Sequence, residues 1–446
     1  MKIWQKKFDS LKIVNDFTVG NDRMFDLQLA PFDVLGSIAH VMMLSKVGLI
    51  NDKEKNNLVL ELKNIFNSIQ KNQFKIDESV EDIHSQIEFI LTKKLGETGK
   101  KIHTARSRND QVLLDMKLFL RSEIEKLTIS IEKLFNILQR QSNRYKNYLL
   151  PGYTHFQVAM PSSFGLWFGA YAESLVDDLK ILENSYKIIN QNPLGSAAGY
   201  GTTFRIDRDI TTKLLGFSSL NYNSVYAQMT RGKTEKIISF ALSNFADTLS
   251  KLSMDLVLYA SQNFNFVSFP NNLTTGSSIM PHKKNLDVLE LIRARTNKIK
   301  SLPNEIALVL TNLPSGYHRD FQVLKENLFP AFEMINSSIE ILILMIENIK
   351  IEKNILNDEK YRYIFSVGEI NKLVDSGKSF RDAYKIVSDK IENNEFIRTK
   401  FDKTSLGSHK GSIGNLCNTE IKKEFVKTLS QFPFKKVNSS LNNIVL

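Results

Sequence analysis

Apolar residues recur at alternating steps of three and four along a segment from Asp110 to about Leu150 that contains neither glycine nor proline. This spacing places them on one face of an α-helix. About forty helical residues span roughly 60 Å at 1.5 Å per residue. The stripe consists of Leu113, Met116, Leu120, Ile124, Leu127, Ile131, Leu134 and Leu138. We interpret it as the buried face of a long bundle helix.

The same stepping returns twice later in the chain, and a further helix is expected from Ser162 to Gln191. The second stripe consists of Ile238, Leu242, Phe245, Leu249, Leu252, Leu256 and Tyr259. The third consists of Leu328, Phe332, Ile335, Ile339, Leu342, Ile346 and Ile349. One small chain cannot bury all of these faces, so we expect a central bundle that is shared between subunits.

Shorter helical patterns flank the long ones. Residues 1–105 contain several that are broken by Gly20, Pro31, Gly48, Gly96 and Gly99. After about residue 355 they shorten to 365–374, 380–391 and 421–429. No alternating strand pattern of convincing length is present. The sequence therefore predicts an all-α fold with a helical N-terminal domain at 1–105, a long-helix bundle at 106–355 and a helical C-terminal domain at 356–446.

Composition narrows the class of protein. Of the residues, 42% are hydrophobic, which is ample for a core. The chain of 446 residues is too long for a single compact core. The net charge of +11 raises the question of a nucleic-acid partner. The lysines are spread through almost every segment and form no basic block with interleaved aromatic residues, so we expect no such partner. The excess of cations remains compatible with a polyanionic substrate.

Cysteine, histidine and hydropathy exclude several further classes. Cys417 is the single cysteine, which rules out a disulfide framework within the chain and suits a reducing cytosol. The seven histidines show no ligand spacing, so neither a metal nor an organic cofactor is expected. The N-terminus lacks the apolar run of a secretory signal, and no uncharged stretch reaches the length of a membrane span. We expect a cytoplasmic protein without membrane segments.

Polar islands interrupt the apolar pattern, and the most informative one runs from Thr275 to Asn285. Gly276 permits a turn, two serines follow, and a helix is expected directly beyond Pro281. The free N–H groups of a helix start, together with Lys283, would stabilise a carboxylate or a deprotonated Ser277 that acts as a base. A Gly-Ser-Ser tripeptide by itself is more typical of an ordinary loop and helix cap.

The whole stretch is more specific than the tripeptide. It resembles the Gly-Ser-Ser-x-Met-Pro-x-Lys-x-Asn signature of the aspartase/fumarase superfamily. Enzymes of that superfamily eliminate an amine or water from a succinyl group and release fumarate. Leu286 departs from the signature, because the superfamily usually has proline after the asparagine. The departure removes some rigidity from the first turn and no polar group.

Other polar islands lie earlier in the chain. The first in sequence order is Glu81 to His84, and the second is His103 to Gln111. Its two arginines, Arg106 and Arg108, have planar forks suited to carboxylates, and Asn109 can both donate and accept hydrogen bonds. The alternative is structural, with Asp110 as a helix cap and the arginines solvated. The His-Thr-x-Arg-Ser-Arg-Asn-Asp-Gln motif resembles that of the argininosuccinate lyases within the superfamily, although Ala105 replaces the usual glycine.

A third island, Pro151 to Gln157, contains a Thr-His pair at a turn marked by Gly152. Histidine can change charge near neutral pH. The pair resembles one in the superfamily, and this resemblance implies that Thr154 binds a substrate carboxylate while His155, oriented by Glu290, takes part in proton transfer. The physical basis is sound, because a carboxylate fixes the tautomer of a histidine and stabilises its charged form.

Two further islands differ in what they imply. The glycine-rich stretch Gly195 to Gly201 follows no strand and so does not indicate a nucleotide cofactor. The stretch Tyr317 to Gln322, with Lys325, resembles the substrate-binding segment of the lyases. Two regions depart from the family pattern. Near Asp22 to Met24 the family more usually has serines that touch the substrate, and this chain has Asn21, Asp22 and Arg23 instead. In Tyr226 to Lys233, which includes Thr230, Ser-Asp-Arg-Asp is commoner.

The resemblance thus implies a lyase that releases fumarate and arginine from argininosuccinate, with no cofactor, as a homotetramer whose sites combine islands from three chains. It implies four catalytic residues: Ser277 as the base, Lys283 at the developing charge, and His155 with Glu290. The implied substrate contacts are His84, Arg106, Arg108, Asn109, Thr154, Asn285, Tyr317, Gln322 and Lys325. Two alternatives remain: a sister lyase for another succinyl substrate, and a catalytically silent structural protein on the same scaffold.

Overall fold

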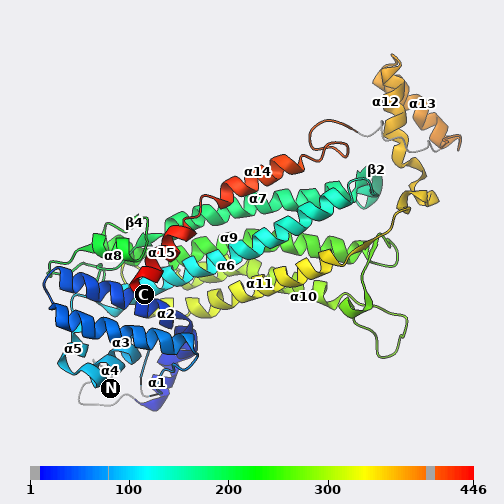
Figure 1. Ribbon diagram of the computed structural model, residues 1–446. Helices are drawn as coiled ribbons and strands as arrows, with labels where there is room; N and C mark the ends of the chain where they lie inside the picture. Colours follow the sequence, from blue (N-terminus) through cyan, green and yellow to red (C-terminus); the bar gives the residue numbers. More distant parts are fainter. Residues whose placement is uncertain (1–10, 79, 398–406, 446) are drawn as a thin grey trace.

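The computed structural model describes residues 11–78, 80–397 and 407–445, and it shows an elongated, mainly helical molecule (Figure 1). Five long helices form its central bundle, so the all-α prediction is confirmed. They are α6 (Arg108–Arg144), α7 (Phe164–Ile189), α9 (Ser224–Tyr259), α10 (Asp287–Val309) and α11 (Leu324–Glu347). The predicted stripe on α6 is its buried face, since each of the eight residues is less than 2% exposed.

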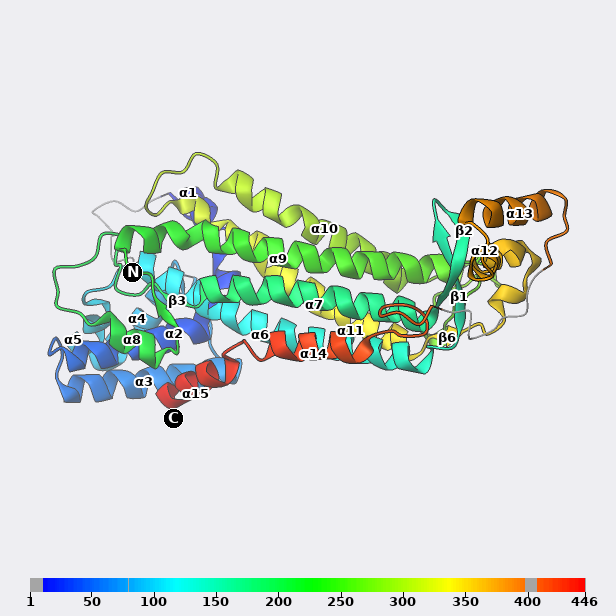
Figure 2. The ribbon, with the colours of Figure 1, turned by 90° about the horizontal axis from the view of Figure 1, so that it is seen from above.

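The five helices pack against one another. Helix α6 packs between α7 and α11, α9 packs on both α7 and α10, and α10 packs on α11 (Figure 2). A single hydrophobic core runs through the bundle and includes stacked rings such as Phe119 on Phe329, whose centroids lie 4.0 Å apart. The three stripes predicted from the sequence are thus buried almost entirely within one chain, which corrects the expectation that a single chain could not cover them.

A second core fills the N-terminal end of the molecule. Its main helices are α2 (Asp22–Lys46), α3 (Asp52–Gln70) and α4 (Ile83–Leu95), with the shorter α1 (Lys12–Val19), α5 (Glu97–Lys100) and η1 (Lys101–His103). Helix α3 begins at a capping box in which Asn51 and Glu54 satisfy each other's backbone N–H groups. Helix α8 (Arg208–Leu214) joins this core from the middle of the chain.

The strands correct one expectation. Strands β1 (Leu149–Thr154) and β2 (Gln157–Ser163) form an antiparallel hairpin at the far end of the bundle, where no strand was predicted. Pro151, Gly152 and Pro161 hide the alternation that would have indicated it, and the register is irregular between Pro151 and Tyr153. The other strands are two-residue pairings: β3 (Gln191–Asn192) with β4 (Ser219–Leu220), and β5 (Val267–Ser268) with β6 (Lys350–Ile351).

The C-terminal segment packs in three places. Beyond η4 (Ile355–Asn357) and η5 (Glu359–Phe365), helices α12 (Ser366–Asp375) and α13 (Phe380–Glu392) share a small core at the hairpin end. Helix α14 (Asn418–Leu429) then lies along α7, and α15 (Phe434–Val445) reaches α2 and α8 at the other end (Figure 1). The division at residues 105 and 355 stays a prediction.

Two helical segments are long and apolar enough to cross a membrane by length and composition: α2 and residues Arg319–Glu347, which comprise η3 (Arg319–Gln322) and α11. In α2, 72% of the apolar window is buried inside the molecule, and in the second segment 50% is. Helices that line the core of a bundle meet the same criterion, so their hydropathy is explained by packing against their neighbours.

Helix α6 also buries a lysine. Lys117 is 1% exposed, and its Nζ donates to Gln191 O at 3.1 Å and Asn221 Oδ1 at 2.5 Å. Burial lowers the pKa of Lys117 to about 7. Between pH 7 and 10.5 the folded protein then binds fewer protons at this site than the unfolded chain, so the free energy of unfolding rises with pH in that window.

We expect Lys117→Met to remove this contribution. The pH slope of the free energy of unfolding should fall by up to about 1.4 kcal/mol per pH unit between pH 7.5 and 9.5. Urea unfolding at several pH values measures the slope. Lys126→Met, which changes an exposed lysine on the same helix, should leave it unchanged. Equal slopes in the wild type and Lys117→Met would contradict the expectation.

Candidate active site

A polar pocket of about 140 Å³ lies where the N-terminal helices meet the bundle, and six of the predicted substrate contacts line it. The lining residues are Asp22, Asp26, Glu81, Asp82, His84, Arg108, Asn109, Val112, Arg231, Tyr317, Arg319, Gln322 and Lys325. Three islands that are far apart in sequence, at 81–84, 106–111 and 317–325, therefore converge here. The sequence resemblance implied that these islands converge, and the tertiary fold brings them together in one pocket.

Two helix starts position the first two islands. Asp82 is the N-cap of α4 and accepts the Ser85 N–H at 2.8 Å. Ser107 is the N-cap of α6 in a capping box with Asp110. Between these helix starts, Arg108 donates to Asp82 at 3.1 Å and to Ser85 Oγ at 2.7 Å. These two hydrogen bonds hold the partly buried side chain of Arg108 at the edge of the pocket.

Asp110 explains the glycine-rich island. Its carboxylate accepts the backbone N–H groups of Gly195 at 3.0 Å and Ala197 at 2.9 Å. Burial raises the pKa of Asp110, while these hydrogen bonds oppose the change. Residues 195–201 are thereby tied to the start of α6 and have a structural role, which agrees with the absence of a nucleotide-binding context in the sequence.

Arg106 lies beside the pocket and is buried. It donates to Ser37 Oγ at 3.0 Å and is 8% exposed. The residue before it, Ala105, has φ of +59°, a left-handed conformation that favours glycine. The glycine usual at this position in the lyases is therefore explained by backbone geometry, and the alanine here is strained.

We expect Ala105→Gly to raise the free energy of unfolding by about 0.5–1 kcal/mol, because relief of the left-handed strain outweighs the added flexibility of the unfolded chain. Urea denaturation measures the change. The matched control is Ala246→Gly in α9, where helical geometry makes the same substitution destabilising by about 1 kcal/mol. A loss of stability in Ala105→Gly would contradict the strain.

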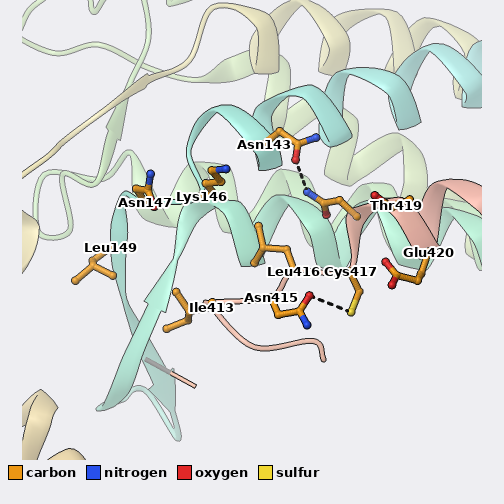
Figure 3. A pocket seen from close by; sticks show the side chains of 12 residues that line it. Asn143, Lys146, Asn147, Leu149, Ile413, Asn415, Leu416, Cys417, Thr419 and Glu420 are labelled. Atoms are coloured by element: carbon orange, nitrogen blue, oxygen red, sulfur yellow. Dashed lines mark hydrogen bonds between the residues drawn. The ribbon is translucent and has the colours of Figure 1, made fainter. Parts of the chain in front are cut away.

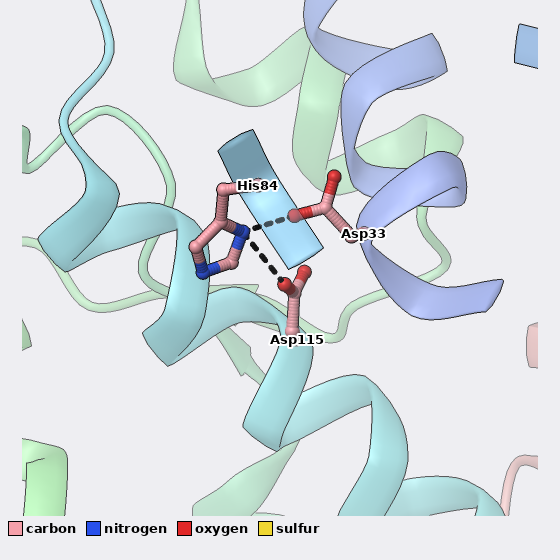
Figure 4. A group of neighbouring side chains, drawn as sticks. All are labelled: Asp33, His84 and Asp115. Carbon is pink, nitrogen blue, oxygen red and sulfur yellow. Dashed lines mark hydrogen bonds and ion pairs between the residues drawn. The ribbon is translucent and has the colours of Figure 1, made fainter. Parts of the chain in front are cut away.

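Behind the pocket, His84 contacts two buried carboxyl groups (Figure 4). His84 Nδ1 hydrogen-bonds with Asp33 Oδ2 and lies 3.6 Å from Asp115 Oδ2. Gln111 Nε2 donates to the same Asp33 oxygen at 2.9 Å. The Nε2 atom of His84 points away from both carboxyl groups (Figure 4).

The charges of this cluster follow from its contacts. Burial opposes ionisation, but the charge and hydrogen bond of His84, with Arg106, lower the pKa of Asp33 to about 2. Burial likewise opposes the charged form of His84, yet Asp33 raises its pKa. Burial and the Asp33 charge raise the pKa of Asp115 well above its usual value. These contacts therefore favour the charged forms of Asp33 and His84 and the protonated form of Asp115.

The same three residues include ligand types of a divalent cation, and one ligand atom from each lies within 4.8 Å of the others. Asp33 and His84 contact each other directly, however, so the space between them is closed. Hydrogen bonds join Asp33 to His84 and to Gln111, whereas neither carboxyl oxygen of the buried Asp115 has a hydrogen-bond partner among the described residues. The cluster could not be predicted from the sequence, since Asp33, His84 and Asp115 lie on three different helices.

The segment from Tyr317 to Lys325 closes the pocket against α1 and α2. Gln322 Nε2 donates to Thr18 O at 2.9 Å, and Arg319 donates to Thr18 O at 2.9 Å and to Glu81 at 3.1 Å. Lys325 is 3% exposed and forms ion pairs with Asp22 and Asp26. Gln322 and Lys325, predicted as substrate contacts, are thus held at the pocket by neighbouring elements.

A kink in α9 contributes Arg231, which was not predicted. Arg231 and Gly232 leave helical geometry, with φ of +79° at Gly232, and Leu310 packs where a side chain at residue 232 would lie. Arg231 donates to Phe321 O at 3.1 Å and pairs with Glu235 at 3.1 Å. The sequence signal was the glycine inside an otherwise helical pattern.

Two acidic residues were also missed, Asp22 and Asp26. With Asp33 they recur at steps of four and seven on one face of the apolar helix α2. Carboxylates at helical spacing on an otherwise hydrophobic helix indicate a functional polar face. The region had been noted only as a departure from the family pattern.

Thr154 and His155 lie elsewhere, at the tip of the β1–β2 hairpin, and both are exposed. A turn was predicted here without flanking strands, and the structure shows that it is the turn of a hairpin. His155 and Phe156 both have positive φ, 53° and 56°, which is the geometry of a two-residue hairpin turn. The hairpin packs on the segment that follows α9 through Tyr153 and Phe264, whose ring centroids lie 5.4 Å apart.

The loop containing Ser277 differs from the expectation as well. The helix begins at Asp287 and not directly beyond Pro281, because Thr275 and Asn285 pair their backbones at 3.0 and 2.8 Å and close the intervening loop. Ser277 Oγ accepts the Met280 N–H at 3.1 Å. Donors to this oxygen therefore come from its own turn and not from a helix start.

The remaining residues of this loop are placed as follows. Lys283 is exposed, Asn285 Nδ2 donates to Gly276 O at 3.4 Å, and Glu290 is exposed in the first turn of α10. Leu286, where proline is usual, packs its side chain against the bundle core. The departure from the family pattern thus adds apolar contact at the base of the loop.

The predicted site is split within one chain. Helix α10 leads from the Ser277 loop toward the segment that closes the pocket, and its 23 residues span roughly 35 Å. Helix α6 begins at Arg108 and ends near the hairpin, and its 37 residues span roughly 55 Å. The hairpin that carries His155 and the start of α10, which follows the Ser277 loop, therefore lie at one end of the bundle (Figure 1). The start of α6, whose residues line the pocket, lies at the other end.

A larger pocket, of about 450 Å³, opens where α14 starts beside the end of α6 (Figure 3). Asn418 Nδ2 donates across it to Asn143 Oδ1 at 3.0 Å. None of the predicted site residues lines it. Its lining residues include neither paired carboxylates nor a histidine for proton transfer.

Comparison with solved structures shows which class of protein has this fold. An EDDS lyase in complex with formate superposes with a TM-score of 0.75 at 20% identity, covering 98% of this chain and 94% of that one. A class II fumarase from Schistosoma mansoni gives 0.72 at 16% identity, covering 94% and 95%. The fold is thus that of the fumarase-type lyases, and the family model described as Lyase matches residues 9–300.

Sequence relatives narrow the class. An argininosuccinate lyase of Bacteroides fragilis is 54% identical over 434 residues, 97% of this chain and 96% of that protein. One of Parabacteroides distasonis is 52% identical over 444 residues, 100% and 99% of the two chains. One of Thermotoga neapolitana is 37% identical over 389 residues, 87% and 98%. The chain belongs to the argininosuccinate lyase family.

Proposed function

We infer that this protein catalyses the elimination of arginine from argininosuccinate, which leaves fumarate. The observation that carries the inference is the identity of more than 50% with argininosuccinate lyases over nearly the full chain. The arginine-rich second island and the convergence of three islands in one pocket agree with a substrate that carries three carboxylates. Because the reaction releases arginine, it belongs to arginine biosynthesis.

The proposed chemistry begins at a carbon beside a carboxylate. Ser277 removes its proton, and the electron pair moves into the carboxylate to give a doubly charged aci-carboxylate. Lys283 and Asn285 stabilise that charge. The electron pair then forms the C=C bond of fumarate, while the C–N bond breaks and the nitrogen of arginine takes a proton. Ser277 suits the base role because its oxygen already accepts the Met280 N–H.

The proposal assigns His155 and Glu290 to proton handling at the leaving group. His155 sits at an exposed hairpin tip and Glu290 on an exposed helix face, so both are available to another subunit. Thr154 beside the histidine would bind a substrate carboxylate. In the pocket, His84, Arg106, Arg108, Asn109, Tyr317, Gln322 and Lys325 would bind or position the substrate.

We further propose a homotetramer whose active sites combine parts of three chains. Support comes from the split of roughly 35 Å or more between the pocket and the Ser277 loop, which no side chain can bridge. Exposed apolar residues on the bundle, such as Phe240, Met254, Leu291 and Leu308, offer surface for such an assembly. The setting proposed for the enzyme is the cytoplasm.

Purified protein mixed with argininosuccinate should release fumarate, which absorbs in the ultraviolet. Release from adenylosuccinate or malate in place of argininosuccinate would assign a sister lyase activity. Release from none of the three would indicate a catalytically silent protein. The assay therefore separates the inferred function from both alternatives left open by the sequence.

A further inference from the structure

The outer part of the β1–β2 hairpin rests on the rest of the chain through Tyr153. Within residues 153–158, all of which the structure describes, Tyr153 is half-buried and the other five are exposed. The pairing of the two strands is irregular between Pro151 and Tyr153, directly below this tip. An irregular pairing holds the tip less firmly than a regular ladder does. The position of the tip therefore depends on what the Tyr153 side chain contacts.

Tyr153 contacts two segments that lie far apart in the sequence. Its ring packs on Phe264, which follows α9, and its hydroxyl lies 3.2 Å from the hydroxyl of Tyr361 in η5. Figure 2 shows the hairpin beside the C-terminal segment that contains η5. Apolar contact has little directional preference, whereas a hydrogen bond has a preferred length and angle. The hydroxyl pair is therefore the contact that defines where Tyr153 lies.

Tyr361 is itself held firmly in the bundle core. Its side chain is 1% exposed, and its ring centroid lies 6.3 Å from that of the fully buried Phe266. The Lys360 ammonium group lies 5.1 Å from the centroid of the same ring, within the range of a cation–π contact. Burial raises the pKa of the hydroxyls of both Tyr153 and Tyr361. Both hydroxyls are therefore neutral near pH 7, and one can donate to the other.

Resting on the function inferred above, we propose that Tyr361 is a positioning residue whose hydroxyl, bonded to that of Tyr153, holds the hairpin tip that carries His155. His155 follows Tyr153 by two residues, so a shift of Tyr153 displaces the imidazole directly. Proton transfer requires its donor and acceptor within hydrogen-bond reach, and a misplacement of about 1 Å can cost about 100-fold in rate. The C-terminal segment thus contributes to catalysis without touching the substrate.

The test removes one hydroxyl at a time from the full-length protein. Tyr361→Phe keeps the buried ring, and in the fumarate assay its kcat should fall about 10-fold. KM should change less than about 3-fold, because most of the proposed substrate contacts lie in the pocket at the other end of the bundle. Tyr153→Phe breaks the same hydrogen bond and should show the same loss of kcat. The variant with both substitutions should lose no more than either single variant.

Two further measurements separate positioning from a merely structural role. In a His155→Ala background, Tyr361→Phe should cause no further loss of kcat, because the hydroxyl acts through His155. Hydrogen–deuterium exchange over residues 149–163 does not depend on activity, and it should be faster in Tyr361→Phe than in the wild type. The matched control is Tyr363→Phe in the same η5 segment, whose ring packs on Phe396. It should alter neither the kinetics nor the exchange.

An unchanged kcat in Tyr361→Phe, an equal loss with and without His155, or unchanged exchange in the hairpin would each overturn the proposal. If Tyr361→Phe does not fold, the half-buried Tyr153→Phe decides by the same three measurements. A wild type inactive on argininosuccinate would overturn the inferred function, and with it the catalytic role of Tyr361. The exchange measurement would then still show whether the Tyr361 hydroxyl holds the hairpin, so the two failures are distinguishable.

Discussion

Ser277→Ala should reduce fumarate release by roughly 1,000-fold, which is within the usual contribution of a general base. The methyl group cannot accept the proton, and no other hydroxyl occupies its place in the turn closed by Thr275 and Asn285. Steady-state assays on argininosuccinate measure the loss. The assembly should be unchanged in size on gel filtration, because the loop is exposed and contributes little to the core.

The adjacent Ser278→Ala is the matched control for this prediction. Ser278 is exposed in the same loop, and the Met280 N–H donates to Ser277 and not to it. Its loss should therefore change the rate far less than the loss of Ser277. Full activity in Ser277→Ala, or equal losses in the two variants, would remove Ser277 from the role of base.

Two inactive variants should restore activity when they are combined. Ser277→Ala damages the loop at one end of the bundle and Asn109→Ala the pocket at the other. Each site would take these two parts from different chains. In randomly mixed tetramers about a quarter of the sites then receive both parts intact, so activity should return to about a quarter of the wild-type value.

Coexpression of the two chains, followed by the fumarate assay, measures the recovery. A mixture of Ser277→Ala with the double variant Ser277→Ala/Asn109→Ala has no intact loop and should remain inactive. Failure of the first mixture to recover, with assembly intact on gel filtration, would mean that loop and pocket serve the same chain's site. The shared-site tetramer would then be wrong.

The long helices could be predicted because their apolar residues recur at a helical period over tens of residues. Both ends of α7 and the start of α6 were within two residues of the prediction, and the stripe on α6 is fully buried. The end of α6 was wrong, because the helix stops at Arg144 and strand β1 begins at Leu149, inside the range predicted as helix. The hairpin that carries His155 could not be predicted. Its prolines and glycine interrupt the alternation of side chains, and its pairing depends on backbone contacts across the turn.

The start of α10 shows a second limit. A proline followed by charged residues indicated a helix directly beyond residue 281, yet backbone pairing of Thr275 with Asn285 delays it to Asp287. Competition between a helix start and a loop closure is decided by contacts at both ends of the loop. Local sequence preference does not contain that information.

The sequence by itself determined the helical class, the long apolar faces and the residue types available for chemistry, because these depend on spacing along the chain. Only the tertiary structure decided where those residues meet. It joined three islands in a pocket with Asp22, Asp26 and Arg231, and buried the cluster of Asp33, His84 and Asp115 behind it. It also placed the hairpin that carries His155 and the start of α10, which follows the Ser277 loop, at the opposite end of the bundle, since the rigid length of α6 and α10 fixes the distance between their ends.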